Sequence, residues 1–300
     1  MKIGFIGLGR MGGNMVRRLL ARGVSVVAWD PDQAARAAVE TAGAATADSI
    51  EALPGMLSGQ AGPRAVWLMV PAGKIVDDSL AALVPLLAKG DIIIDGGNSN
   101  WKDSRRRGED LAARGIEFVD CGTSGGVWGL ENGYCLMYGG SREAIEVLRP
   151  VFDGLAPDRG HLRCGPVGSG HLVKMVHNGI EYGMMQAYAE GFELMEKSPF
   201  EIDAAAVASV WREGSVVRSW LLDLVARALA ENPEMEGIAP WVADSGEGRW
   251  TVEAGVEFGV PVPVISQALF ARFASRNDDS YALKLLAAMR DQFGGHGTRK

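Results

Sequence analysis

The sequence predicts an α/β fold in which a doubly wound sheet is followed by an all-helical carboxy-terminal domain. Apolar, strand-like segments alternate with helical patterns from residue 2 to residue 164, which is typical of repeated βα units with helices on both faces of a parallel sheet. After Pro199 this alternation ends. Five segments there repeat apolar residues at helical spacing, namely 200–211, 217–229, 248–258, 264–273 and 279–292. We therefore expect two domains, 1–166 and 167–300.

The composition excludes several classes of function. The 300 residues are 47% hydrophobic and 22% charged, as in a globular protein, and the net charge of −7 provides no overall basic field for nucleic acid or an anionic membrane. No uninterrupted apolar run is long enough to span a bilayer. The three cysteines are odd in number and lack CxxC spacing, which favours a reducing cytoplasm without disulfides or zinc. We expect no bound metal, because no Asp, Glu and His cluster has ligand spacing.

The amino terminus carries a dinucleotide-binding pattern. A short apolar strand at 2–6 runs directly into a GxGxxG motif at 7–12, and a helix through Leu20 follows. Glycines at these positions permit a tight turn and a close approach of the backbone to a pyrophosphate at the helix N-terminus. A lone motif of this kind is often an ordinary glycine turn, but a second apolar strand at 24–29 completes the Rossmann-type context here. The expected cofactor-binding residues of this turn are Gly7, Leu8, Gly9, Arg10, Met11 and Gly12.

Asp30 follows the second strand, at the place where the adenosine ribose of a bound dinucleotide is expected. A carboxylate there accepts a hydrogen bond from the 2′-OH of NAD and repels the 2′-phosphate of NADP. Pro31, Asp32 and Gln33 offer no cation that could hold such a phosphate. The sequence therefore predicts NAD rather than NADP as cofactor. The alternative is that Asp30 caps the helix that follows.

Three more apolar strands, at 65–70, 91–95 and 116–120, end in glycine-rich segments at 71–73, 96–99 and 122–126. Each segment alone would be read as a turn. Ligands of such sheets lie beyond the carboxyl ends of the strands, so a row of open strand ends predicts a cleft. Strands at 133–139 and 160–164 complete the domain. Further cofactor contacts are expected from Val70, Pro71, Ala72 and Asn98.

A helix expected at 171–182, HLVKMVHNGIEY, places polar side chains at spacings i, i+3, i+4, i+7 and i+8, which is one face of a helix. The alternative for the helix considered alone is a solvated outer face. The apolar flanks and the scarcity of other charges favour a buried stripe that meets a ligand. Its members are Lys174, His177, Asn178, Glu181 and Tyr182.

Motifs spread over nearly the whole chain resemble one family. They are GLGRMGGN at 7–14, DGGNS at 95–99, TSGG at 123–126, VKMVHNGIEYGMMQ at 173–186, GRWT at 248–251, FAR at 270–272 and RDQFGGH at 290–296. In this combination the chain resembles the decarboxylating 6-phosphogluconate dehydrogenases of the β-hydroxyacid dehydrogenase superfamily. The tail follows the FAR helix almost at once, as in the short form of that family, which is associated with bacteria and often with NAD.

The resemblance implies a role for individual residues. Lys174 matches the general base and acid, Glu181 matches a second acid, and His296 matches a tail histidine that contacts substrate. Arg249 stands where the family usually has the lysine of GKWT, so the charge is kept and a bidentate fork is gained. The residues that match holders of the sugar acid and the nicotinamide are Asn98, Ser124, Gly125, Gly126, His177 and Asn178. Those that match the phosphate site are Tyr182, Thr251, Arg272 and Arg290.

The implied reaction is the oxidative decarboxylation of 6-phosphogluconate to ribulose 5-phosphate and CO2, a step of the pentose phosphate pathway and of gluconate utilization. Lys174 can accept the proton of the 3-hydroxyl only as a neutral amine, which burial and the positive nicotinamide favour and Glu181 opposes. The charged lysine then protonates the keto oxygen during loss of CO2. Glu181 protonates C1 of the resulting enediol.

In the family the tail reaches into a neighbouring subunit, so a homodimer or homotetramer is expected, with Arg290 and His296 completing the neighbour's site. The alternative is a tail that stays with its own subunit or frays. Two other functions remain open. A non-decarboxylating NAD-dependent β-hydroxyacid dehydrogenase would need the lysine and asparagine but not the arginine set. A non-catalytic NAD-binding regulator would keep GxGxxG without Lys174 and Glu181.

Overall fold

A computed structural model describes residues 1–295 and 297. The chain divides into two compact units, residues 1–177 and 178–300. The first holds the sheet, and the described part of the second contains helices and no strand, which confirms the predicted fold class. The division at residues 166 and 167 stays a prediction.

The first unit is built on one eight-stranded sheet in the order β3-β2-β1-β4-β5-β6-β7-β8. Neighbouring strands run parallel throughout, except that β7 is antiparallel to β6. In the centre, Gly4 of β1 lies between Val27 of β2 and Val66 of β4. The strands are β1 (Lys2–Ile6), β2 (Ser25–Trp29), β3 (Ala45–Thr46), β4 (Ala65–Leu68), β5 (Ile92–Asp95), β6 (Glu117–Ser124), β7 (Cys135–Gly139) and β8 (His161–Gly165).

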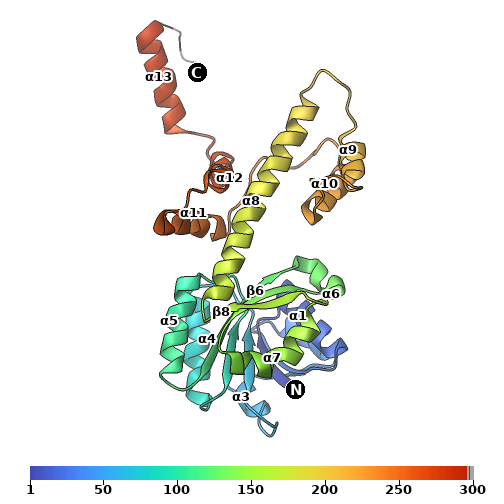
Figure 1. Cartoon of the computed structure of the whole chain (residues 1–300), viewed down its shortest axis with the longest axis vertical. Helices are drawn as coiled ribbons and strands as arrows, with labels where there is room; N and C mark the ends of the chain where they lie inside the picture. Colours follow the sequence, from blue (N-terminus) through green and yellow to red (C-terminus); the bar gives the residue numbers. More distant parts are fainter. Residues whose placement is uncertain (296, 298–300) are drawn as a thin grey trace. The chain divides into compact units, whose positions relative to one another are not determined.

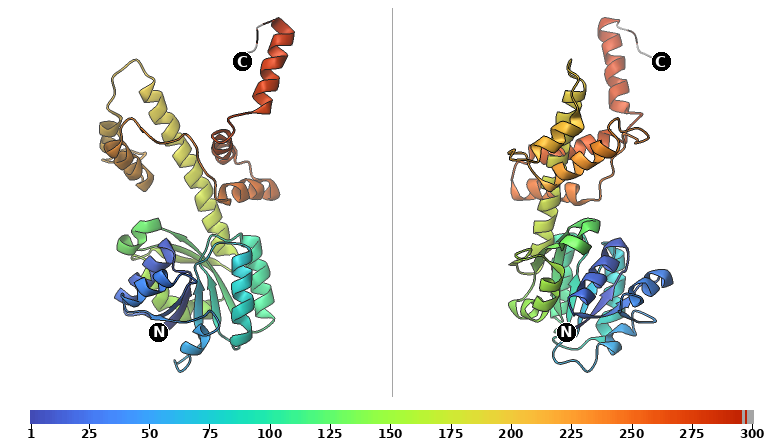
Figure 2. Two further views of the ribbon diagram at one scale, coloured as in Figure 1. Left: turned by 180° about the vertical axis from the view of Figure 1, so that it is seen from behind. Right: turned by 90° about the vertical axis from the view of Figure 1, so that its right-hand side faces the viewer.

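Helices cover both faces of this sheet (Figure 1). One face packs against α1 (Arg10–Ala21), α2 (Gln33–Glu40) and α7 (Arg142–Leu155), through side chains such as Leu19 and Phe152. The other face packs against α3 (Leu53–Met56), α4 (Lys74–Leu83) and α5 (Trp101–Ala112), through side chains such as Leu83 and Leu111. Both cores are therefore apolar, as a doubly wound sheet requires, and the sheet is seen between its two helical layers in Figure 2. The remaining turns of helix are η1 (Val84–Leu86), η2 (Gly126–Trp128) and α6 (Gly129–Asn132).

The short strand β3 was not predicted, and β6 is longer than its prediction. The sequence predicted a strand at 116–120 followed by a glycine-rich loop, whereas β6 continues to Ser124. The physical reason is the antiparallel partner β7, which pairs Cys121 with Tyr138 and Thr123 with Leu136. Gly122 is consequently a strand residue and not a turn residue.

Helix α8 (Ser169–Glu196) is 28 residues long and passes from the first unit into the second. The second unit continues with α9 (Ala204–Trp211), α10 (Trp220–Glu231), α11 (Glu247–Phe258), α12 (Pro263–Ala274) and α13 (Tyr281–Gly294). All five predicted helices are present, but α9 and α10 begin three to four residues later than predicted. Asp203 and Ser219 cause this, because their side chains accept the backbone N–H of Ala206 and of Leu222 as N-caps.

A small apolar core in the second unit joins α9 and α10 to α8, and contains Ala208 and Leu222 with Tyr188 and Phe192 packed against it. A separate cluster packs Tyr182 of α8 against Ala268 and Leu269 of α12. In the part of the chain that the structure describes, every helix is too short or too polar to cross a lipid bilayer.

Candidate active site

The glycine turn after β1 is closely packed at two of its glycines and open at the third. Gly7 has φ +94°, and a Cβ there would lie 2.3 Å from the carbonyl oxygen of Met69. A Cβ on Gly12 would lie 2.0 Å from the carbonyl oxygen of Gly7, whereas Gly9 faces open space. Gly9 is the N-cap of α1 and no side chain caps that end. The first N–H groups of α1 can therefore donate to an anion at this turn.

The side chains of the turn divide between core and surface. Leu8 is buried in the sheet's core, while Arg10 is exposed and Met11 half-buried on the first turn of α1. Arg10 thus stands beside the uncapped helix N-terminus, where its charge favours an anionic ligand.

The Asp30 side chain is hydrogen-bonded to the backbone of the same turn. Its Oδ2 accepts the Leu8 N–H at 2.6 Å and its Oδ1 accepts the Asp32 N–H at 2.8 Å. Asp32, not Asp30, caps α2, because its carboxylate accepts the Ala34 N–H. The capping alternative for Asp30 is therefore wrong. Its oxygens each keep a lone pair with which to accept a ribose hydroxyl.

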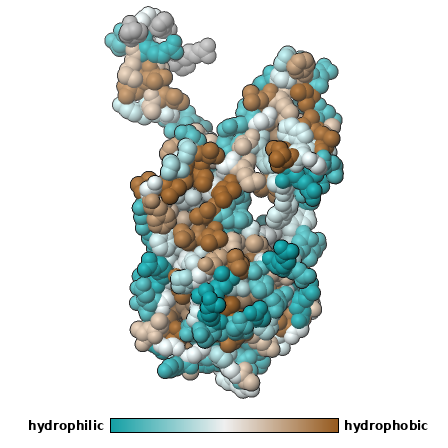
Figure 3. Space-filling view, in the orientation of Figure 1, coloured by the Kyte–Doolittle hydropathy of each residue, from teal (hydrophilic) through white to brown (hydrophobic). Residues whose placement is uncertain are grey.

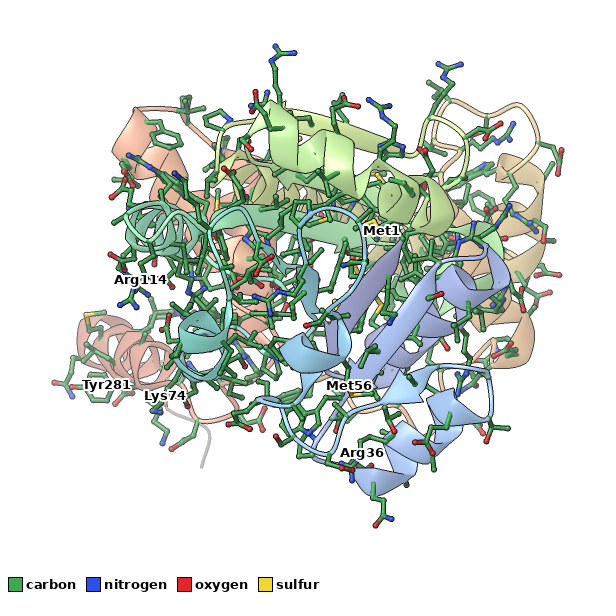
Figure 4. The ribbon with its side chains drawn as sticks, turned by 90° about the horizontal axis from the view of Figure 1, so that it is seen from below. Met1, Arg36, Met56, Lys74, Arg114 and Tyr281 are labelled. Carbon is green, nitrogen blue, oxygen red and sulfur yellow. The ribbon has the colours of Figure 1, made fainter. Side chains whose placement is uncertain are left out.

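A cation does lie near Asp30, which the sequence analysis missed. Arg36, labelled in Figure 4, sits on α2, and its Nη1 donates to the backbone carbonyls of Asp30 and Pro31. The three residues after Asp30 indeed lack a positive charge, but α2 turns Arg36 back towards the loop. The loop after β2 thus carries a positive charge beside the Asp30 carboxylate.

The loop that follows β4 lies against the loop that follows β5. A Cβ on Gly97 would lie 2.7 Å from the carbonyl oxygen of Val70, so the two loops touch at that point. Pro71, Ala72 and Asn98 are exposed there. These residues thus form part of one edge, as predicted from the carboxyl ends of parallel strands.

The buried side chain of Arg107, on α5, links the segments that follow β4 and β5. Its side chain is 1% exposed and donates to Asp77 Oδ1 at 2.9 Å and to the Gly73 carbonyl at 3.1 Å, and it lies 3.4 Å from Asp95 Oδ2. Asp95 is fully buried and accepts the Ser99 hydroxyl at 2.7 Å. Sequence reasoning missed Arg107, since in WKDSRRRGED it looks like one of several surface arginines.

Lys174 sits directly against β6. The ideal Cβ of Gly122 would lie 2.2 Å from the Lys174 Cβ, so only glycine allows this approach. Lys174 is 7% exposed. One turn later, His177 Nε2 lies 3.4 Å from the Ser124 hydroxyl at the end of β6. The following glycines, Gly125 and Gly126, both have positive φ, which opens the backbone beyond the strand.

A buried carboxylate fixes the start of α8. Asp120 of β6 accepts the Gly168 N–H and the His171 N–H, each at 2.7 Å. Burial raises the pKa of Asp120. The His171 ring is 1% exposed, and its Nδ1 lies 2.7 Å from the Ser104 hydroxyl of α5. The Asp120 bonds anchor the start of α8 to the sheet, and the Ser104 contact joins it to α5, one turn before Lys174.

The polar stripe of α8 is turned inwards along its whole length. Lys174, Asn178 and Tyr182 are buried, and His177 and Glu181 are half-buried. Five apolar residues of this part of α8 have exposed fractions of 38% to 52%, namely Val173, Val176, Ile180, Met184 and Met185, whereas Met175 is buried. This is the reverse of a solvated polar face, so that alternative is wrong.

In the second unit, α8 and α11 cross at two glycines. A Cβ on Gly179 would lie 2.6 Å from Thr251 Cγ2, and one on Gly248 would lie 2.4 Å from the Tyr182 ring. Thr251 donates to the carbonyl of Glu247 at 2.8 Å. The crossing places Asn178, Tyr182 and Thr251 within one compact helix junction.

Two of the predicted phosphate arginines gather beside Tyr182. The Arg272 guanidinium of α12 lies 3.5 Å from the centre of the Tyr182 ring, and Arg249 of α11 lies 4.4 Å from the centre of the Phe273 ring. Arg290 is not part of this group: it is exposed on α13 and makes no hydrogen bond or ion pair within the described residues. His296 lies outside the described residues.

Among residues 1–295 and 297, no group of three His, Cys, Asp or Glu side chains is placed to hold a metal ion. The chemistry available to the described side chains is therefore that of an amine, a carboxylate, an imidazole and a set of guanidiniums beside a dinucleotide turn.

Comparison with known proteins identifies the family. Residues 2–167 match the model of the NAD binding domain of 6-phosphogluconate dehydrogenase, and residues 170–283 match the model of its C-terminal domain. The chain belongs to the 6-phosphogluconate dehydrogenase family. It is 45% identical to a putative 6-phosphogluconate dehydrogenase of Bacillus subtilis, and the match covers 100% of both chains. It is 46% identical to the NAD(+)-dependent, decarboxylating enzyme of Haloferax volcanii over 99% of this chain and 98% of that one.

Other 6-phosphogluconate dehydrogenases are longer. The human decarboxylating enzyme is 38% identical, and the match covers 98% of this chain but 64% of the human one. The structure of the Plasmodium falciparum enzyme, studied with NADP+ and with 6-phosphogluconate, superposes with a TM-score of 0.85 at 29% identity, over 98% of this chain and 65% of that one. The predicted short form of the family agrees with these lengths.

Proposed function

We propose that this 6-phosphogluconate dehydrogenase oxidises 6-phosphogluconate at its 3-hydroxyl with NAD and releases the carboxyl carbon as CO2, which leaves ribulose 5-phosphate. The observation that carries the proposal is the inward-facing stripe of α8, with Lys174 7% exposed and Glu181 two helical turns further on. An amine and a carboxylate so placed can transfer protons at different steps of one reaction.

The turn after β1 fits NAD. The open side of Gly9 and the uncapped N-terminus of α1 offer backbone N–H groups to the pyrophosphate, and Asp30 offers carboxylate oxygens to the ribose. When bound there, NAD supplies a hydride acceptor. Preference for NAD rests on Asp30 and on the name of the Haloferax volcanii relative, while Arg36 is the side chain that would moderate the preference.

Lys174 moves the first two protons. As a neutral amine it accepts the proton of the 3-hydroxyl while a hydride leaves C3, which gives a β-keto acid. The ammonium so formed then donates its proton to the keto oxygen. The C1–C2 bond electrons move into the new enediol as CO2 leaves, and the lysine is neutral again. Burial favours the neutral amine at the start of each cycle.

Glu181 donates the last proton to the terminal carbon of the enediol. The neutral Lys174 accepts the proton of the hydroxyl on the neighbouring carbon, which becomes the ketose carbonyl, and exchange with water returns both side chains to their starting protonation states. The substrate's hydroxyl and carboxyl groups are held by Asn98, Ser124, Gly125, Gly126, His177 and Asn178 in this proposal. The phosphate is held by Tyr182, Arg249, Thr251 and Arg272. Arg290 and His296 complete the site from the tail.

We propose a homodimer or homotetramer in which the tail of one subunit completes the site of another. Exposed apolar side chains support assembly, because a monomer rarely leaves so many uncovered. They lie on α8, as given above, and on α13, where Leu283, Leu285, Leu286 and Met289 are 46% to 67% exposed. Apolar residues are also seen at the surface of the helical unit in Figure 3.

The test is CO2 release from 6-phosphogluconate with NAD and with NADP in parallel assays. We expect stoichiometric CO2 and NADH, a higher kcat/KM with NAD, and very poor use of gluconate. Hydride transfer without CO2 would establish the non-decarboxylating dehydrogenase instead. Binding of NAD without turnover of any β-hydroxyacid would establish the regulator.

A further inference from the structure

Asp244 joins two arginines of the helical unit. It precedes α11, and its side chain is 4% exposed. Arg249 donates to both of its oxygens, from Nε to Oδ1 at 2.8 Å and from Nη2 to Oδ2 at 3.1 Å. Arg276, which follows α12, donates from Nη2 to Oδ2 at 2.7 Å. A single buried carboxylate therefore sets the spacing of two guanidiniums that come from different elements.

Arg276 is not a freely solvated side chain. It is 24% exposed, its Nε donates to the Arg272 carbonyl at 3.2 Å, and its guanidinium lies 5.5 Å from the centre of the Phe273 ring. The Arg249 guanidinium lies against the same ring. An aromatic face and a carboxylate together hold both planar groups, which limits their loss of side-chain entropy when they bind a ligand.

Arg272 completes the group. Its Nη1 donates to the carbonyl of Ala243, the residue next to Asp244, and its guanidinium stacks on Tyr182. Three guanidiniums and one carboxylate leave two positive charges among these four side chains. The other buried carboxylate nearby, Glu247, accepts the Ser245 hydroxyl. A phosphate monoester carries about −1.5 to −2 charges at pH 7, and it is attracted to this group, which stays net positive even when Glu247 is counted as a second carboxylate.

Arg276 and Arg249 keep N–H groups that can donate hydrogen bonds to a phosphate. A guanidinium has five N–H groups, and the bonds above engage two of those of Arg276 and two of those of Arg249. If Asp244 simply neutralised a surface arginine, one partner would suffice. It instead spaces two arginines beside a third, which is the arrangement that several phosphate oxygens need.

We propose that Arg276 is a further phosphate-binding arginine of the substrate site and that Asp244 positions Arg249 and Arg276 for this contact. The inference rests on the proposed function, because the phosphate is that of 6-phosphogluconate. It assigns to Arg276 direct contact with the ligand and to Asp244 an indirect role.

The test compares Arg276→Gln, Arg276→Lys and Asp244→Asn with the wild-type enzyme. Arg212→Gln is the matched control, since Arg212 also pairs with one aspartate, Asp223, in the same unit but away from this group. We expect Arg276→Gln to raise KM for 6-phosphogluconate about tenfold or more with kcat within about threefold, and Arg276→Lys to recover part of that loss. KM for NAD should not change, and the slow turnover of gluconate should be unaffected.

Asp244→Asn separates positioning from charge. If Asp244 only repelled the phosphate, its neutralisation would lower KM; positioning predicts a rise. Calorimetric Kd values for 6-phosphogluconate and inorganic phosphate make the test independent of turnover, so a wild-type enzyme that binds but does not react would refute the proposed function and leave this inference measurable. Thermal unfolding confirms that each variant is folded. An unchanged Kd and KM in folded Arg276→Gln, or a lower KM in Asp244→Asn, overturns the inference.

Discussion

The ideal Cβ position of Gly122 lies 2.2 Å from the Cβ of Lys174, so β6 and α8 meet where no side chain fits between them. The catalytic lysine of the proposed mechanism is thus placed by a residue that contributes no chemical group. Asp120, two residues earlier on β6, fixes the start of the same helix by accepting the N–H of Gly168, which precedes the helix, and the N–H of His171 in its first turn. The position of the amine is set by the sheet.

We expect Gly122→Ala to reduce kcat by at least about a hundredfold, because the added methyl must displace Lys174 or α8 and misplacement of a reacting group by about 1 Å has costs of that size. NAD binding, measured by fluorescence or calorimetry, should persist, since the glycine turn is distant in the sheet. Gly191→Ala is the control within the same helix. Its Cβ meets nothing within 4 Å, so it should leave activity intact and stabilise the helix by about 0.5–1 kcal/mol. Full activity of Gly122→Ala would contradict the close contact.

Lys174 and Glu181 should be separable by the step they affect. Lys174→Met removes the only group assigned to the first two proton transfers, so hydride transfer and CO2 release should both vanish while NAD still binds. Glu181→Gln should retain part of the hydride transfer and slow the final protonation by about 10²–10⁴-fold. Rapid-quench measurements of NADH, CO2 and ketose distinguish the two variants. An active Lys174→Met enzyme would disprove the mechanism.

The cofactor preference should depend on Asp30 and Arg36 together. Asp30→Ser removes the carboxylate that repels a 2′-phosphate, while Arg36 supplies a nearby cation, so kcat/KM should shift towards NADP by about tenfold or more. Asp30→Ser combined with Arg36→Gln should lose much of that gain. Because Asp30 also accepts the Leu8 N–H, both variants should bind NAD more weakly than the wild type. Equal use of NAD and NADP by the unmodified enzyme would contradict the assignment of Asp30.

The ion pairs of Asp244 should make the helical unit sensitive to acid. The hydrogen bond from Arg249, followed by that from Arg276, lowers the pKa of Asp244 to about 2, although removal from water opposes this. A carboxyl group whose pKa is lower in the folded than in the unfolded state stabilises the fold above the unfolded pKa of about 4. That contribution is lost as the pH falls from about 4 to about 2. The difference in unfolding free energy between the wild type and Asp244→Asn should therefore be constant above about pH 5 and shrink below pH 4. A difference that persists at pH 2 would show that Asp244 acts through something other than its charge.

The sequence predicted the parts of the fold that depend on local patterns. Alternating apolar segments located the strands, helical periodicity located α9 to α13, and the stripe on α8 was recognised because its polar residues recur at the spacing of a helix. Each of these features depends on the residue pattern of a short segment of the chain. Even there, side-chain caps such as Asp203 moved the helix ends by a few residues.

Contacts between distant segments could not be predicted in this way. Gly122 looked like a turn residue until its strand partner and Lys174, 52 positions away, were brought against it. Arg107 and Arg276 looked like surface arginines, because nothing local marks the carboxylates they meet. The one local signal for Arg276 is its i, i+4 spacing from Arg272, which puts both on one side of α12 and its end.

The tail of each subunit is expected to complete the active site of its neighbour. Arg290 lies exposed on α13, whose apolar side chains are uncovered, and the tail beyond it carries His296. If the tail completes a neighbour's site, then a Lys174→Met subunit and a subunit truncated after Gln292 should each be inactive as homodimers. Mixed dimers would contain one site with both lesions and one with neither.

An equimolar mixture with free subunit exchange should thus recover about a quarter of the wild-type activity, since half of the dimers are mixed and each has one intact site of two. Two different affinity tags, purified in sequence, confirm that mixed dimers have formed. A tail that served its own subunit would place one lesion in every site of the mixed dimer, and no activity would return. NAD affinity of the truncated protein is the control, because the glycine turn and Asp30 lie wholly in the first unit and should bind the cofactor without the tail.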